Sequence, residues 1–158
     1  MTDLVKLPKF RKIYQLHIHH SWKPDYSDFN GINHIELFNQ IKNYHIHHNK
    51  WNDIGYHYVV FPDGLIIKGR KITKTPASIK GYNDGAIAIC MIGNFDKNDI
   101  TSDQWYTTIN LSAELITAFK IKQVFFHRDL NSHKTCPGLK IKKDKFMDDL
   151  NHLLNLRR

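Results

Sequence analysis

A histidine and a cysteine, His127 and Cys136, lie on the two sides of a short polar segment. Imidazole nitrogen and thiolate sulfur are the ligands that zinc prefers in proteins. The β-branched and aromatic run from Val124 to Phe126 predicts the end of a buried strand, and Pro137-Gly138 predicts a turn directly after the cysteine. The two side chains could therefore converge. Because two ligands do not make a metal site, a third must come from elsewhere in the chain.

The segment Leu16-His17-Ile18-His19-His20-Ser21 offers that third ligand. Alternation from Ile13 to His19 predicts a strand, and its period of two places His17 and His19 on one face and His20 on the other. A ligand at the end of such a strand would be firmly held. The residues alone leave His17 and His20 as alternatives to His19.

A second histidine-rich segment, His45-Ile46-His47-His48, is similar to the first but follows a predicted helix. Asn33 with Glu36 matches a capping box, and apolar residues at helical spacing predict an amphipathic helix from residue 34 to about 48. Cations are favoured at a helix C-terminus by the helix dipole, and Asn49 suits the position just past the helix. We interpret this segment as a helix end rather than as a metal site.

The remaining pattern alternates strands with helices. Two β-rich runs, Ile54 to Phe61 and Leu65 to Lys68, flank the turn Pro62-Asp63-Gly64 and predict a hairpin. The apolar run Ala86 to Ile92 predicts a central strand buried on both faces. Thr101 with Gln104 matches a second capping box, ahead of a helix that reaches Phe119.

A last strand at Val124 to His127 and an amphipathic helix through Phe146, Leu150, Leu153 and Leu154 complete the pattern. The expected fold class is α/β, with a central mixed β-sheet flanked by about three helices. We expect one domain over residues 1–158. The length and a hydrophobic content of 41% suit one core and one cleft.

Several classes of protein are disfavoured. The opening residues 1–12 carry charges and a proline where a signal peptide needs an apolar core, and no run approaches the roughly 18 apolar residues of a membrane span. We therefore expect synthesis in the cytoplasm without stable membrane insertion. Cys90 lies in an apolar run and is expected to be a buried thiol, so a disulfide with Cys136 is disfavoured in that compartment.

The formal net charge of +8 allows an anionic partner, such as nucleic acid, a membrane surface or an acidic wall polymer. The basic residues are scattered, and they form no groove interleaved with aromatic side chains of the kind that binds single strands. We expect no nucleic-acid binding. A basic surface that serves solubility, or one that meets anionic wall polymers, fits the pattern.

Six motifs, in order along residues 13 to about 140, resemble the zinc-dependent type 2 N-acetylmuramoyl-L-alanine amidases, a family that includes small phage lysozymes and the peptidoglycan recognition proteins. The motifs are Ile18-His19-His20-Ser21, Trp51-Asn52-Asp53-Ile54-Gly55-Tyr56-His57-Tyr58, Asp63-Gly64 to Gly69-Arg70, Gly81-Tyr82-Asn83, Ile92-Gly93-Asn94-Phe95, and His127-Arg128-Asp129 to Cys136-Pro137-Gly138. Their common order makes the set far more specific than any single motif.

The resemblance implies one Zn²⁺ per chain, held by His19, His127 and Cys136. Two neutral imidazoles and one thiolate leave a fourth position open, as a catalytic zinc requires. Such an ion polarises an amide carbonyl and lowers the pKa of bound water to about 7. The resemblance also places the catalytic tyrosine and lysine of the family at Tyr56 and Lys134, which suit amide hydrolysis because one can transfer a proton and the other is a cation.

Substrate contacts are expected at His20, Ser78 and Asn83. Ser78 stands where many members of the family have a histidine, so the preference for the peptide could differ. Lys50 replaces a glycine before the tryptophan of another motif, a change in a turn that Asn49 could absorb. The segment from His127 to Cys136 is also longer than in phage relatives, with His133 as the inserted residue.

The implied function is hydrolysis of the amide bond between N-acetylmuramic acid and L-alanine in bacterial peptidoglycan, as a bacteriolytic phage or prophage endolysin that acts as a monomer. Without a signal peptide, the enzyme would reach the wall through a separate pore or after lysis. Two other classes remain open. One is a peptidoglycan-binding module that does not cut, and the other is a protein-binding regulator similar to a polymerase inhibitor.

Overall fold

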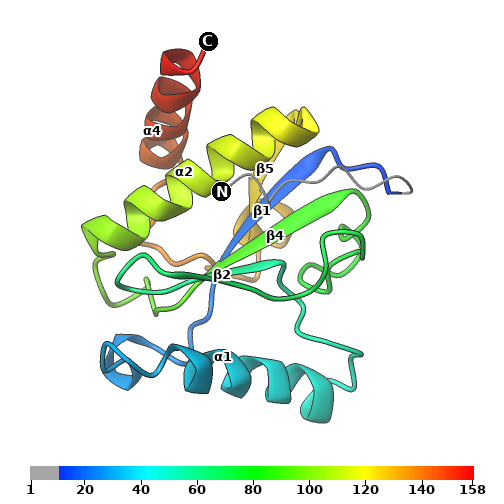
Figure 1. The fold of residues 1–158 in the computed structure, drawn as a ribbon, viewed down its shortest axis with the longest axis vertical. Helices are drawn as coiled ribbons and strands as arrows, with labels where there is room; N and C mark the ends of the chain where they lie inside the picture. The colour runs from blue at the N-terminus through cyan, green and yellow to red at the C-terminus, as the bar shows by residue number, and fades with distance from the viewer. Residues whose placement is uncertain (1–10) are drawn as a thin grey trace.

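The computed structural model describes residues 11–158 (Figure 1). The opening segment, on which the expectation of no signal peptide rests, lies mostly outside the described residues. Five strands form one sheet in the order β3-β2-β4-β1-β5. Their bounds are β1 Gln15–His20, β2 Tyr58–Val60, β3 Ile66–Lys68, β4 Ala86–Met91 and β5 Gln123–Phe126.

The sheet is mixed, as predicted. β1 pairs in parallel with both β4 and β5, β2 pairs in parallel with β4, and only β3 runs antiparallel, as the second strand of the hairpin with β2. All six residues of β4 and all six of β1 are buried. The prediction of a central apolar strand at Ala86 to Ile92 is therefore confirmed, because a strand covered on both faces is apolar at nearly every position.

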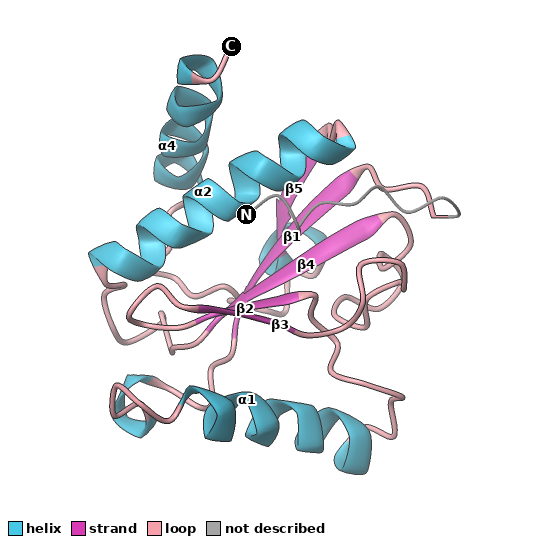
Figure 2. Ribbon diagram, viewed as in Figure 1, coloured by secondary structure: helices cyan, strands magenta, loops and turns pink. Residues whose placement is uncertain are grey.

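Helices cover the two faces of the sheet unequally (Figure 2). Helix α1 (His34–Asn43) lies on one face, whereas α2 (Ser102–Phe119) and α4 (Lys143–Leu156) lie on the other. Helix α3 (His127–Leu130) is a single turn after β5. Leu16 and Ile18 of β1 pack under α2 and α4, so the alternate residues of this strand point to the face that carries α1. Among residues 11–158, no helix is both long and apolar enough to cross a bilayer.

The two predicted capping boxes form only in part. Asn33 is the N-cap of α1, but its side chain makes no cap bond and instead accepts a hydrogen bond from the backbone amide of Asn30. Thr101 does cap α2, with its Oγ1 accepting from the Gln104 amide at 3.1 Å. The Gln104 side chain turns inward and donates to the Val60 and Ile92 carbonyls, so it ties α2 to the sheet instead of completing the box.

The end of the first helix also differs from expectation. After α1 the chain continues as a π-helical turn, Tyr44–His48, so the predicted extent to about residue 48 is right but the last turn is wider. Asn49 keeps a right-handed conformation, and Lys50 takes the left-handed one at φ 62°. Asn49 does not absorb the turn, because Lys50 itself adopts the conformation for which glycine is favoured.

His57 joins three segments of the sheet region. It directly precedes β2, and its ring is buried. Nδ1 accepts a hydrogen bond from the Ala88 amide at 3.0 Å, and Nε2 donates to the Lys74 carbonyl at 2.8 Å. The bond that Nδ1 accepts requires the neutral ring, and burial lowers the pKa of His57 to about 3, against the opposing effect of the Lys74 carbonyl.

This burial predicts acid sensitivity. As pH falls, the unfolded chain takes up the proton near the ordinary pKa of 6.5, whereas folded His57 does so only near 3. The free energy of unfolding should be level above about pH 7 and should fall between about pH 6.5 and 3, with one proton contributing about 1.4 kcal/mol per pH unit. Thermal melts at a series of pH values measure this slope.

His57→Gln should be less stable at pH 7, because a buried backbone partner is lost, yet its stability should fall less steeply between pH 6 and 4. The matched control is His152→Gln, which changes an exposed histidine of α4 and should keep the wild-type slope. An unchanged slope in His57→Gln would contradict the role assigned to this ring.

Candidate metal centre and its cleft

The ends of two parallel strands bring His19 and His127 together. Strand β1 lies next to β5 with Ile18 opposite Phe126, so His19, near the end of β1, and His127, the first residue after β5, lie side by side. Their ring centroids lie 5.0 Å apart in a T-shaped arrangement. Side chains at the carboxyl ends of adjacent parallel strands meet at one edge of a sheet, which is the usual place for a ligand site in such folds.

Cys136 reaches this edge on a loop that Arg128 and Asp96 hold in place. The Arg128 amide donates to the Cys136 carbonyl at 2.9 Å, and the guanidinium donates to the Gly138 and Ile141 carbonyls. Asp96, just after β4, accepts from the Thr135 hydroxyl at 2.8 Å and from the Leu139 amide at 2.9 Å. These contacts bracket the cysteine on both sides and fix its sulfur against β1.

Together His19, His127 and Cys136 form a compact group. Their ligand atoms all lie within 4.8 Å of one another. Cys136 Sγ is 3.7 Å from His19 Nδ1, and it also accepts a hydrogen bond from the His20 amide at 3.4 Å. His19 Nε2 is buried and has no hydrogen-bond partner. Two imidazole nitrogens and one sulfur this close together form a donor set that fits one shared cation.

Both imidazole rings, those of His19 and His127, are kept in the neutral form that can bind a metal ion. Burial, reinforced by His127, lowers the pKa of His19 well below 6.5, and burial followed by the nearby Lys134 lowers the pKa of His127. Both imidazoles are therefore neutral at pH 7. Burial raises the pKa of the Cys136 thiol to about 12, against the opposing effect of the His20 amide. Binding a cation through this sulfur would release the thiol proton, so the two events are linked.

The two alternative histidines of β1 have other partners. His17 Nε2 lies 2.8 Å from the Gln15 side-chain oxygen. His20 Nδ1 accepts from the Phe95 amide at 3.1 Å, and its ring stacks on Phe95. Among residues 11–158, His19, His127 and Cys136 are the group in which three such ligands lie close enough to hold an ion. The second histidine segment supplies no such group.

A cavity of about 350 Å³ opens over this group. Tyr56 and Lys134, the predicted catalytic residues, both line it, and so does His133, the residue interpreted as an insertion. The Tyr56 ring lies 5.3 Å from that of His19. Burial, followed by the nearby Cys90 and Cys136, raises the pKa of Tyr56 well above 10. Its hydroxyl therefore stays protonated at neutral pH, and it lies within hydrogen-bonding reach of the buried Cys90 thiol.

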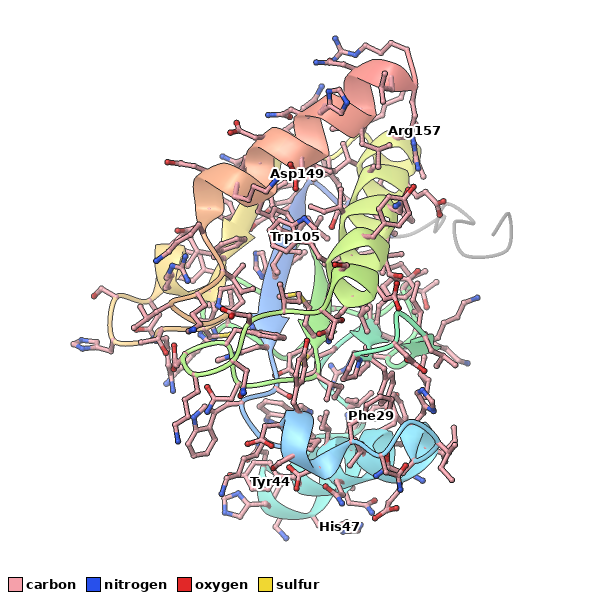
Figure 3. All side chains as sticks on the ribbon, turned by 90° about the vertical axis from the view of Figure 1, so that its left-hand side faces the viewer. Phe29, Tyr44, His47, Trp105, Asp149 and Arg157 are labelled. Atoms are coloured by element: carbon pink, nitrogen blue, oxygen red, sulfur yellow. The ribbon has the colours of Figure 1, made fainter. Side chains whose placement is uncertain are left out.

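A second cavity of about 610 Å³ adjoins the first, and Trp22 and Tyr56 line both. Its further lining includes Tyr44, the first residue of the π-helical turn, which Figure 3 labels near the end of α1. The two cavities together form an elongated cleft on the sheet face that carries α1. A separate cavity of about 650 Å³ at the start of α2, lined in part by Trp105 and Lys142, contains no member of the metal group.

Two of the three predicted substrate residues lie elsewhere. Asn83 uses its side-chain oxygen inside the protein, where it accepts from the Ser78 and Ile79 amides at 2.9 Å. Neither Asn83 nor Ser78 is among the described residues that line the two cavities of the cleft. His20, in contrast, lines the cavity over the metal group. Contact of these residues with a substrate stays a prediction.

Sequence reasoning missed the residues that hold and extend the site. Arg128 was noted only as part of a motif, and its contacts with three carbonyls of the following loop leave no periodic signal. Asp96 acts on residues far along the chain. Trp22 could have been noticed as a large aromatic residue directly after the histidine segment, before a lysine and a proline.

Comparisons with known proteins agree with this arrangement. A family model described as N-acetylmuramoyl-L-alanine amidase matches residues 9–139. The endolysin of Klebsiella phage KP32 is 28% identical over 98 residues, which cover 59% of this chain and 64% of the relative. Peptidoglycan-recognition protein SC2 of Drosophila simulans is 31% identical over 110 residues, which cover 68% of this chain and 59% of the relative.

Among solved structures, N-acetylmuramoyl-L-alanine amidase LysC from Clostridium intestinale matches with a TM-score of 0.72 and 25% sequence identity, covering 89% of this chain and 87% of that chain. The matched segments span less than two thirds of the length of the two curated relatives above.

In the loop that carries Cys136, we expect Gly138 to be sensitive to substitution by alanine. Gly138 has φ +109°, and a Cβ there would lie 2.5 Å from the Phe95 backbone, whereas Gly31 has φ +91° and open space. Gly31→Ala should lower the free energy of unfolding by about 1–2 kcal/mol, because alanine is strained in the left-handed conformation. Gly138→Ala should cost more, because the Phe95 backbone must also shift. Urea unfolding of the two variants measures the difference, and equal losses would show that the loop does not depend on this contact.

Proposed function

The chain belongs to the N-acetylmuramoyl-L-alanine amidase family, and we propose that it is a zinc hydrolase that cleaves the amide bond between N-acetylmuramic acid and L-alanine in bacterial peptidoglycan. The observation that carries the proposal is the group of His19, His127 and Cys136, which lines a cavity of about 350 Å³ that shares Trp22 and Tyr56 with a second cavity of about 610 Å³. Similarity to phage endolysins supports an endolysin role.

Zinc fits the residues that would hold it. Two neutral imidazoles and one thiol that can lose its proton are the donor types of catalytic zinc sites with three protein ligands. The distance of 3.7 Å from Cys136 Sγ to His19 Nδ1 supports one shared ion. When bound, zinc would supply Lewis-acid polarisation of the scissile carbonyl and activation of water.

The chain's own residues would position and stabilise the reacting amide. Tyr56 keeps its hydroxyl proton at neutral pH, so it would donate a hydrogen bond to the oxygen that gains negative charge, or orient the attacking water. Lys134, which lines the same cavity, would bring a cation toward that developing charge. Neither residue needs to hold the metal to act in this way.

A binding module that does not cut is the alternative from a different class, because the relatives include a peptidoglycan-recognition protein. The presence of both Tyr56 and Cys136 favours hydrolysis, since binding alone needs neither a thiol nor a buried hydroxyl beside it. Purified walls distinguish the two classes. Hydrolysis releases free L-alanine amino groups from the wall and lowers its turbidity, whereas a binding module sediments with the walls and releases nothing.

The metal proposal predicts one zinc ion per chain. Protein purified without chelator should contain about one equivalent, and His127→Ala or Cys136→Ser should reduce that content strongly, because each removes one of three protein ligands. His47→Ala is the matched control, since it removes an exposed histidine of the second segment and should leave the content unchanged. Metal analysis of the variants decides, and full retention of zinc in His127→Ala would refute the assignment.

The catalytic proposal predicts that Tyr56→Phe and Lys134→Ala keep zinc and the fold but lose wall hydrolysis. Loss of one group aimed at a developing oxyanion costs about 10²-fold to 10³-fold in kcat. Tyr106→Phe and Lys142→Ala, both at exposed positions outside the cleft, are the matched controls. Initial rates on a soluble muropeptide give kcat, and a near wild-type kcat in either cleft variant would remove that residue from the mechanism.

A further inference from the structure

Trp22 combines two features that are unusual for a large aromatic residue. Its side chain is 54% exposed, and its backbone is left-handed at φ 60°. Among residues 11–158, the other non-glycine residues with positive φ are Lys50 and Lys120. A bulky side chain in this conformation is a genuine outlier, and such outliers concentrate at sites that bind ligands.

The backbone around Trp22 is firmly held in this conformation. The Trp22 amide donates to the Gly93 carbonyl at 2.9 Å. The Ser21 hydroxyl donates to the Pro24 carbonyl at 2.6 Å and accepts from the Gly93 amide at 2.9 Å. The turn after β1 is thus tied to the end of β4, and it presents the indole ring to solvent beside the metal group.

Trp22 lies where the two cavities of the cleft meet, since it lines both. Tyr44, also 54% exposed, lines the larger cavity, and one face of its ring stacks on His48 at 4.5 Å. Lys23 Nζ lies 5.4 Å from the centre of the Trp22 ring. A substrate whose amide lies at the metal group would place its first unit on one side of that bond against Trp22.

Each cavity is lined by one lysine and one aspartate, and the two cavities differ in the rest of their lining. In the larger cavity, Lys23 is offset by Asp28, and the remaining lining is aromatic or uncharged apart from His45, which burial keeps neutral at pH 7. Aromatic faces with a few hydrogen-bonding groups suit a neutral pyranose ring, whose axial C–H bonds are attracted to the negative face of an indole. In the smaller cavity, the Asp96 carboxylate accepts hydrogen bonds from the Thr135 hydroxyl and the Leu139 amide, so the carboxylates of a stem peptide would meet the Lys134 ammonium there.

We propose that Trp22 is a specificity-determining residue that stacks against the sugar next to the scissile amide, with the glycan running into the larger cavity. This inference rests on the proposed function, because the sugar is the muramic acid of peptidoglycan. The peptide half of the substrate then lies on the side of Lys134.

The test measures binding of the two uncleavable halves of the substrate by isothermal titration. The probes are the disaccharide N-acetylglucosaminyl-N-acetylmuramic acid and the dipeptide L-alanyl-D-isoglutamine. Trp22→Asn should raise the Kd of the disaccharide about tenfold, which corresponds to 1.4 kcal/mol, and leave the Kd of the dipeptide unchanged. Trp22→Phe, which keeps an aromatic face, should lie between the wild type and Trp22→Asn.

Thermal unfolding supplies a second readout. Asparagine tolerates the left-handed conformation, so Trp22→Asn should not lower Tm, whereas a residue kept for stability would lower it. Lys120→Asn is the matched control, because Lys120 adopts φ 54° at the C-cap of α2 and lines neither cavity of the cleft. It should show the same stability pattern and wild-type Kd values for both probes.

Three results would overturn the inference: wild-type protein that does not bind the disaccharide, an unchanged disaccharide Kd in Trp22→Asn, or a Kd that rises for the dipeptide instead. Hydrolysis is scored separately on whole muropeptide. Wild-type protein that binds the disaccharide through Trp22 but cleaves nothing would refute the amidase proposal and leave the role of Trp22 intact.

Discussion

The parallel register of β1 between β4 and β5 is the constraint on which the site depends. Leu16 and Ile18 point into the core beneath α2 and α4, so His17 and His19 must point to the opposite face. A slip of one residue would exchange the two sets and bury an imidazole in the apolar core. The hydrophobic packing of two side chains therefore fixes where the proposed ligand lies, and α2 and α4 contribute to the site without touching it.

Burial of several histidines near this face creates a second constraint, because a buried ring must be neutral and hydrogen-bonded. His20, His45 and His57 satisfy this constraint in the same way, because Nδ1 of each accepts a hydrogen bond from a backbone amide. His19 does not, since its Nε2 is buried without a partner and its Nδ1 faces sulfur. An unpaired buried nitrogen does not by itself identify a ligand, because His17 Nδ1 is also buried without a partner. The closeness of His19 to His127 and Cys136 makes the distinction, and neighbouring positions in the sequence cannot show it.

The sequence predicted those features that arise from local pattern. Apolar runs and alternation located the hairpin, the central strand and the end of β1, because burial on a sheet leaves a direct trace in residue type. Features that depend on distant partners were missed or misread. Gln104 completes no capping box because two sheet carbonyls take its amide, and Lys50 rather than Asn49 turns left-handed. The convergence of His127 and Cys136 was predicted, whereas the Arg128 and Asp96 contacts that hold the loop were not.

The three proposed ligands are held with unequal strength, and this inequality has a consequence for the metal-free protein. His19 lies in the fully buried strand β1 and His127 directly follows the adjacent β5, whereas Cys136 lies on a loop fixed largely by hydrogen bonds near the surface, including both contacts of Asp96. Segments with few buried contacts open at lower free energy than the core. An ion bound by all three residues would therefore stabilise chiefly the loop that also carries Lys134, so that metal binding and placement of the proposed catalytic cation become one coupled event.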